Sequence, residues 1–397
     1  MKPNVKIGSF LMAVVMIFSV LIVSGCTPMS LNKEWSYKSG DKELAIGVYI
    51  YSLDTAYQKA KSFAEKLDDY DETKDSWLEM EITDDDGKKE VASKWIKDQA
   101  KLMCLSYLVL DEQIEKEKVD ISKDTIASAD EQAETYWNVG QYADYGYVMP
   151  MKNDLEPYGI SLESFRYCST EYSVKYQALF DKLYKEGGSK EVTNEELTKY
   201  FNDNYTDYSY FSVNLYTSST DEAGQSTNVA MSDKEAKKVT DEIDGYVKDV
   251  NGGKSYDDVL KAYMKANEIE SDPSTSNIEN LENSSLGDEV KEAIKKLDNK
   301  KAAAVKVGSG ENAVYYFVYK RNIKDAAKDY LADENNSANV LSSMKGEEFA
   351  DYIEELTKSL DYEENTSVIN QYEPKMFFVP VEPTTSAEES SDSSAKE

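Results

Sequence analysis

The chain has 397 residues, of which 40% are hydrophobic, and its formal net charge at pH 7 is −31. This hydrophobic content is enough to build folded cores, but so acidic a protein is excluded as a nucleic-acid binder, because phosphate backbones are bound by basic surfaces. The sequence contains no histidine, which excludes a Ser-His-Asp triad, a Cys-His nucleophile pair and a histidine-ligated zinc ion.

The first 25 residues have the pattern of a lipoprotein signal peptide. Two lysines precede an uncharged run over residues 7–23, and Ser24-Gly25 stand directly before Cys26. The alternative interpretation is an uncleaved membrane-spanning helix, but the run is shorter than the ~20 residues that such a helix needs. Small residues at the end of the run are typical of a cleavage site. We therefore expect Cys26 to be lipidated and to anchor the protein at the outer face of the cytoplasmic membrane, in a Gram-positive-type bacterium.

Residues 26–40 are polar and are predicted to form a spacer, and residues 41–203 are predicted to be helical. The clearest helix covers 91–118, where apolar residues recur at steps of four and three. Further helices are expected over the ranges 43–67, 123–137 and 162–185. A capping box at Thr193 and Glu196 begins another helix.

The sequence Asp84-Asp85-Asp86-Gly87 resembles part of a calcium loop. If Gly87 takes the sixth position of such a loop, Ile82 and Ser93 stand at the first and last positions, which require Asp and Glu. We therefore expect a solvated turn here. Neither a metal site nor a cofactor is predicted for this chain.

An aromatic stretch lies between two of the predicted helices. It contains Tyr136, Trp137, Tyr142, Tyr145, Tyr147, Met149 and Met151. Tyr offers a large contact area at little cost in rotamer entropy, and Met adapts its shape to a partner. These residues are therefore candidates for binding apolar segments of other polypeptides. The alternative is that they pack in the core of this protein.

Cys104 and Cys168 are the cysteines that follow Cys26. In an exported protein they could form one disulfide. We favour the alternative that both are buried as small hydrophobic residues, because a chain of this length needs no covalent staple.

A different pattern begins near residue 205. Residues 210–216 alternate with period two and predict a strand, and 217–230 predict a polar loop. The following predicted elements are helices over 232–250 and 255–264, a loop over 267–285, a helix over 286–297 and strands over 304–307 and 314–319. The order is β-α-α-α-β-β. Residues 338–360 are again predicted to be helical, and the Ser/Glu-rich residues 380–397 are predicted to be disordered.

This order resembles that of PrsA/SurA-type foldases, in which a parvulin domain is inserted into a helical chaperone domain. Four stretches carry the resemblance. They are Glu191–Phe201, similar to the segment leading into the parvulin domain; Asp233–Val239, similar to the start of its first helix; Gly253–Val259, similar to its G-x-(D/S)-F-x-x-L turn; and Leu286–Leu297, similar to the helix before its last strands.

The resemblance implies a mainly α fold with an inserted α+β domain. It places a SurA-N-like chaperone domain at 41–203, a parvulin-like domain at 204–323 and a C-terminal helix returning to the helical domain at 324–379. The implied function is a membrane-anchored extracytoplasmic foldase or holdase. Its partners would be unfolded or partly folded exported polypeptides.

Active parvulins resemble one another in a histidine on the first strand and another on the last. Laying these patterns on the chain puts Val213 and Val314 at the two positions. No catalytic residue is therefore predicted, and prolyl isomerase activity is expected to be weak or absent. Without histidine, holding of clients is expected to vary little between about pH 5.5 and 7.5.

Two other classes stay open. A solute-binding lipoprotein of an importer would stack Trp and Tyr on sugars, and it would have two α/β lobes with several parallel strands. A structural surface lipoprotein would have no activity. Strand content in residues 41–200 separates the first of these from a chaperone, because a chaperone is expected to have almost none.

Overall fold

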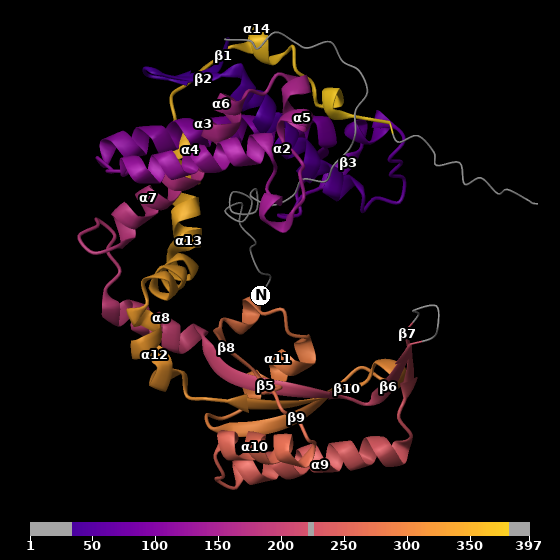
Figure 1. Cartoon of the computed structure of the whole chain (residues 1–397). Helices are drawn as coiled ribbons and strands as arrows, with labels where there is room; N and C mark the ends of the chain where they lie inside the picture. The colour runs from indigo at the N-terminus through magenta and orange to yellow at the C-terminus, as the bar shows by residue number, and fades with distance from the viewer. Residues whose placement is uncertain (1–33, 221–225, 381–397) are drawn as a thin grey trace, which may run out of the picture. The chain divides into compact units, whose positions relative to one another are not determined.

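The computed structural model describes residues 34–220 and 226–380 and is mainly helical (Figure 1). The described residues form two compact units. Unit 1 comprises those up to Glu191 together with those from Lys345 onward, and unit 2 comprises Val192–Met344. Within the described ranges, no helix is both long enough and apolar enough to cross a membrane.

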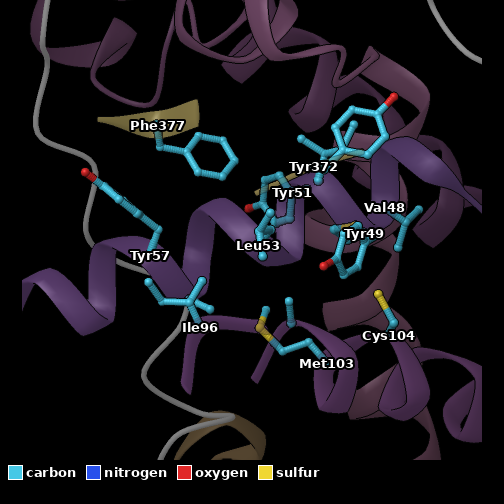
Figure 2. Packing of buried hydrophobic residues seen from close by; sticks show 14 of the residues in the cluster. Val48, Tyr49, Tyr51, Leu53, Tyr57, Ile96, Met103, Cys104, Tyr372 and Phe377 are labelled. Carbon is cyan, nitrogen blue, oxygen red and sulfur yellow. The ribbon is translucent and has the colours of Figure 1, made fainter. Parts of the chain in front are cut away.

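Unit 1 is built on α2 (Ile46–Ala64) and α3 (Ala92–Lys116), which lie side by side (Figure 1). α2 buries every residue from Ile46 to Asp54, as a helix at the centre of a core does. α3 instead buries the stripe that its apolar spacing predicts, which confirms that helix. Figure 2 shows side chains of both helices in one cluster, with Tyr372 and Phe377 from the C-terminal part of the chain.

The other helices of unit 1 are α4 (Lys123–Asn138), α5 (Lys152–Leu155), α6 (Leu162–Arg166) and α7 (Tyr172–Tyr184). A π-helical turn over Tyr167–Glu171 joins α6 to α7, so the predicted helix over 162–185 is one run with a local insertion. Single 3-10 turns lie at η1 (Asp75–Glu79), η2 (Ala143–Tyr145) and η3 (Glu156–Tyr158). α13 (Glu334–Ser359) belongs to unit 1 from Lys345 onward.

Part of the predicted spacer is a strand. β1 (Trp35–Ser39) pairs antiparallel with β2 (Lys42–Ala45) on one side and with β11 (Glu363–Glu364) on the other. Tyr37 is buried, with its ring centroid 6.1 Å from that of Tyr49 in α2. The prediction of a spacer up to residue 40 is therefore wrong from Trp35 onward, because β11 lies far away in the sequence and supplies the pairing.

A second small sheet contains β3 (Glu81–Thr83) and β4 (Lys89–Val91). Its turn is the acidic segment that resembles a calcium loop. The carboxylate of Asp84 accepts hydrogen bonds from the backbone N–H groups of Asp86 and Lys88, so it is engaged by its own turn.

The C-terminal part of the described chain packs on α2. After α13 and β11 come α14 (Thr366–Ile369) and η7 (Pro374–Phe377). The Phe377 ring lies 5.6 Å from Tyr57 of α2 and 4.9 Å from Tyr158 of η3 (centroid distances). The core of unit 1 is thus closed by residues from both ends of the sequence (Figure 2).

Unit 2 contains a four-stranded antiparallel sheet of order β8-β5-β10-β9. The strands are β5 (Thr206–Asn214), β8 (Thr275–Glu279), β9 (Lys301–Val307) and β10 (Val314–Lys320). Figure 1 shows α9 (Asp233–Asn251) and α10 (Tyr256–Ala266) on one face of the sheet and α11 (Asp288–Lys296) on the other. Because side chains alternate along a strand, Phe211 and Phe317 pack towards α9 and α10, and Tyr208 and Val318 towards α11.

Two predicted loops of unit 2 contain strands. β6 (Tyr216–Thr220) and β7 (Ser226–Ala230) form a hairpin within 217–230, and β8 lies within 267–285. These strands are mostly polar and exposed, so they lack the alternation that predicts a strand from sequence. The three predicted helices and the last two strands are confirmed. α8 (Asn194–Asn204) and α12 (Ile323–Ala332) flank the sheet along the chain and contact each other.

Candidate functional site

The segment between α4 and α5, residues 139–151, is called here the aromatic loop. It carries five exposed large hydrophobic side chains. They are Tyr142, Tyr145, Tyr147, Val148 and Met149, with exposed fractions between 40% and 79%. The described residues have eight such side chains in all, so most of the exposed large hydrophobic side chains are gathered in one loop. Concentrated exposed apolar surface marks an interaction site more often than scattered residues do.

The base of the aromatic loop is closed by backbone hydrogen bonds. The N–H of Met149 donates to the carbonyl of Val139 at 2.7 Å, and that of Met151 donates to the carbonyl of Tyr136 at 3.2 Å. Gly140 stands at the crossing point with a φ of +107°, and a Cβ placed there would lie 2.3 Å from the Met149 carbonyl oxygen. A glycine is therefore required for the two arms of the loop to meet.

The tip of the loop is a hydrogen-bonded turn. The N–H groups of Tyr145 and Tyr147 both donate to the carbonyl of Tyr142, at 3.0 and 3.2 Å, and Gly146 has a φ of +81°. Several backbone groups are thus satisfied within the loop, while the apolar side chains are left in water. A loop with this construction can offer contact area without first rearranging its backbone.

Three of the seven predicted aromatic-stretch residues do not belong to this exposed surface. Trp137 is buried, with its ring 5.7 Å from Phe165, and Tyr136 and Met151 are half-buried against the core of unit 1. The contacts of these three residues are those of core packing: Tyr136 and Trp137 lie on α4, and Met151 is the last residue of the aromatic loop. Val148 was not predicted, and its position between Tyr147 and Met149 was the available signal.

The sheet register separates the two positions assigned to the parvulin histidines. Val213 is directly opposite Tyr315, and Val314 is opposite Asn214. Val213 therefore faces α9 and α10, while Val314 lies on the other face of the sheet. By this register the two assigned positions do not share one face of the sheet. On the face of Val314, the rings of Tyr210 and Tyr316 lie 6.0 Å apart.

The face at Val213 is closed by aromatic packing. Phe211 stacks on Tyr263 of α10 at 4.4 Å and on Phe317 at 4.9 Å. Tyr315 donates a 2.8 Å hydrogen bond to Asp244 of α9, and burial followed by this carboxylate raises the pKa of Tyr315 to about 12. Tyr315 stays neutral near pH 7 and holds α9 to the sheet.

The two cysteines of unit 1 are free and buried, as we favoured. Burial raises the pKa of the Cys104 thiol to about 12, partly offset by a hydrogen bond with Ser52, and raises the pKa of Cys168 well above its ordinary value. Both are therefore protonated thiols and poor nucleophiles near pH 7. Cys26, the predicted lipidation site, lies outside the described residues.

The structural neighbours of this chain are foldases, although no protein-family model and no curated protein matches its sequence. It is similar to the crystal structure of foldase protein PrsA from Streptococcus pneumoniae str. Canada MDR_19A, with 14% identity over 76% of this chain and 100% of that chain, at a TM-score of 0.33. It is also similar to PrsA from Bacillus subtilis, with 16% identity over 71% of this chain and 93% of that chain, at a TM-score of 0.24. Because both TM-scores are below 0.5, we base the function on the elements and contacts of this chain.

Proposed function

We propose that this protein is a membrane-anchored extracytoplasmic foldase or holdase, which binds unfolded or partly folded exported polypeptides. The observation that carries the proposal is the aromatic loop, whose exposed apolar side chains stand on a hydrogen-bonded backbone. An unfolded client exposes apolar segments, and covering them removes apolar area from water at about 25 cal/mol per Å². Such contacts are non-directional and suit clients of many sequences.

The domains of the proposal are a lipoprotein signal at 1–25, a chaperone domain in 41–203 with the returning segment 324–379, and a parvulin-like domain at 204–323. The division of the described residues at Glu191/Val192 and Met344/Lys345 supports an inserted module. We propose that this module has weak or no prolyl isomerase activity, since the sequence has no histidine and Val213 is packed beneath α9 and α10.

The solute-binding alternative is less well supported. The strand pairings among the described residues are antiparallel, and within 41–200 the described strands are the short β2, β3 and β4. A surface cavity of about 570 Å³ in unit 1 is lined by the ion pairs Lys97–Glu373 and Lys375–Asp75, not by aromatic rings that could stack on a sugar.

The test uses the chain from residue 27 onward and follows aggregation of a reduced client protein, in parallel with isomerisation of an X-Pro peptide. The triple variant Tyr142→Ser/Tyr145→Ser/Tyr147→Ser should suppress aggregation at least about threefold less well, with an unchanged melting temperature, because these side chains are exposed.

The matched control is Leu102→Gln/Val229→Thr, which removes exposed apolar side chains elsewhere and should keep wild-type activity. Equal suppression by the triple variant and the wild type would contradict a role for the aromatic loop. No suppression by the wild type would favour a purely structural lipoprotein.

A further inference from the structure

We infer that the aromatic loop selects cationic apolar segments, in which Lys or Arg alternates with aromatic or aliphatic residues. This rests on the proposed function, because it names the class of client that the same surface prefers. Two independent features of the loop carry it. They are the charge around the loop and the absence of any cation on its tyrosine rings within the described structure.

The sequence around the aromatic loop is strongly acidic. From Asp124 to Phe165 it has eight acidic residues and one basic residue, Lys152. The ammonium group of Lys152 donates a 3.2 Å hydrogen bond to the side-chain carbonyl of Asn138, which is a neutral group. This stretch has a formal charge of −7, so its negative charge per residue is higher than the average of the whole chain, which has a net charge of −31 over 397 residues.

Six of these carboxylates are exposed and have no ion-pair partner among the described residues. Glu131, Asp144, Asp154 and Glu156 are the four nearest to the aromatic loop in sequence, and Asp124 and Glu163 lie further away. Asp144 lies in the tip of the loop itself, in η2, and Asp154 lies in α5 directly after it. By contrast, Arg166 pairs with Asp130 at 3.3 Å and with Glu134 at 3.6 Å. Three of these unpaired carboxylates thus lie within the aromatic loop or in the five residues after it.

The tyrosine rings of the loop also differ from others in unit 1. Lysine ammonium groups lie over the rings of Tyr167, Tyr352 and Tyr362, at 4.8, 4.5 and 5.1 Å from the centroids. In the described part of the chain no such cation lies over Tyr142, Tyr145 or Tyr147. The negative ring faces of the loop are therefore open to a cation supplied by a ligand.

The two features act in the same direction. A lysine or arginine of a client can lie on a tyrosine face, which contributes about 0.5–1 kcal/mol at an exposed site, while the surrounding carboxylates attract it over about 10 Å at 0.1 M salt. Neighbouring apolar client residues would contact Val148 and Met149. An acidic segment of the same hydrophobicity is repelled by the same carboxylates, and so is an anionic lipid surface.

The experiment compares three fluorescent peptides with identical aromatic and aliphatic residues, whose intervening positions are all Lys, all Gln or all Glu. Binding to the chain from residue 27 onward is measured by anisotropy. At low salt we expect the Lys peptide to bind at least about tenfold more tightly than the Glu peptide, with the Gln peptide between them. The difference should shrink severalfold at about 0.5 M salt.

The charge variant is Glu131→Gln/Asp144→Asn/Asp154→Asn/Glu156→Gln, and it should lose most of the Lys preference while binding the Gln peptide as before. A control neutralises four exposed acids of unit 2 that form no ion pair among the described residues, and it should keep the preference. Its substitutions are Glu268→Gln, Glu270→Gln, Asp298→Asn and Glu311→Gln.

The outcomes separate the two proposals. Equal affinity for the three peptides, abolished by the triple tyrosine variant, would overturn the charge selection and leave the holdase function standing. If the control variant loses the Lys preference as fully as the charge variant does, the preference comes from the net charge of the protein. That result would overturn the role of the loop carboxylates. Binding of none of the peptides would contradict the proposed function itself.

Discussion

Gln58 donates a 3.1 Å hydrogen bond to the carboxylate of Asp54, one turn earlier in α2. Asp54 is buried in the core of unit 1, and this burial raises its pKa to about 6, against the smaller opposite effect of the Gln58 bond; the charge of Asp154 adds to the rise. Asp54 is therefore a buried carboxyl group that titrates near pH 6, inside the range over which holding of clients was expected to vary little in a chain without histidine.

The first prediction is that Asp54 makes unit 1 less stable as the pH rises. The folded state holds the Asp54 proton up to about pH 6, and the unfolded state releases it near its ordinary value of about 3.9. Between these values the folded state binds more protons, so the free energy of unfolding falls with rising pH. From about pH 4.5 to 7.5 the Asp54 contribution falls by about 2 kcal/mol.

Urea unfolding gives the free energy of unfolding of the wild type and of Asp54→Asn at both pH values. The change with pH in the wild type minus the change in the variant is the Asp54 contribution, and this subtraction removes the effects of the many surface carboxylates. Asp144→Asn is the control, because it removes an exposed carboxyl group in place of a buried one. Parallel profiles for the wild type and Asp54→Asn would show that Asp54 titrates normally.

The second prediction concerns Gly140 and Gly146, which both have positive φ but different surroundings. Gly146→Ala meets no atom within 4 Å and should cost only the conformational penalty, about 1–2 kcal/mol. Gly140→Ala would additionally force its Cβ against the Met149 carbonyl, so it should open the base of the loop. Limited proteolysis should cleave the loop of Gly140→Ala much faster than that of Gly146→Ala. Equal cleavage would mean that the close approach does not hold the loop.

The third prediction concerns the boundaries of the inserted module. Phe201 of α8 is fully buried, stacking on Tyr205 at 5.1 Å and on Tyr330 of α12 at 4.9 Å. A fragment of residues 192–344 should therefore unfold cooperatively, while 204–323, which lacks α8 and most of α12, should be markedly less stable. Phe201→Ala in the longer fragment should cost about 3–5 kcal/mol. Equal midpoints for the two fragments in urea would show that these helices are dispensable.

The fourth prediction is that prolyl isomerisation is at least ~100-fold slower than in a parvulin with both histidines, since acid–base and polar positioning groups contribute about 10²–10⁴. Val213→His/Val314→His should not raise the rate, because the two side chains lie on opposite faces of the sheet. A peptide assay at matched protein concentration measures both. A wild-type rate equal to that of a histidine-bearing parvulin would show that a dry pocket is enough.

The fifth prediction concerns the anchor. If Cys26 carries the lipid, Cys26→Ala should leave an unprocessed precursor or release the protein, and metabolic labelling with a fatty acid should be lost. Cys104→Ala is the control and should be labelled normally, because that thiol is buried. Mature Cys26→Ala protein that stays on the membrane would contradict the lipoprotein interpretation.

The sequence predicted best those elements whose signals are local. The capping box at Thr193 is formed with Glu196 as expected, and a second one is formed by Ser232 with Glu235; each depends on residues three positions apart. β8 was missed because its partner, β5, is distant in the sequence. β1 has a distant partner, β11, and an adjacent one, β2, so the β1–β2 hairpin is a local feature that the prediction of a spacer missed. In α4, before the aromatic loop, Trp137 continues the buried stripe of Ala129 and Ala133, so its place in the core could have been predicted from the spacing.

The burial of Asp54 could not be predicted in this way. Periodicity identifies one apolar face of a helix, whereas all residues in the first half of α2, from Ile46 to Asp54, are buried, and α2 contacts α3, α6, the small sheets and the C-terminal segment. Burial by a segment more than 300 residues further along is a property of the tertiary fold. It cannot be predicted from the local sequence pattern.

The meeting of distant segments in unit 1 has a consequence for the order in which a ribosome can complete the protein. In the folded protein the ring of Tyr37 lies 6.2 Å from that of Tyr362, and the ring of Tyr57 lies 5.6 Å from that of Phe377. Tyr37 and Tyr57 cannot make these contacts until the C-terminal residues have been synthesised. Unit 2 is continuous from Val192 to Met344 and is synthesised in full before those residues exist. β1 and α2 are thus synthesised early, but their side chains that contact Tyr362 and Phe377 stay uncovered by those residues until the C-terminal segment emerges.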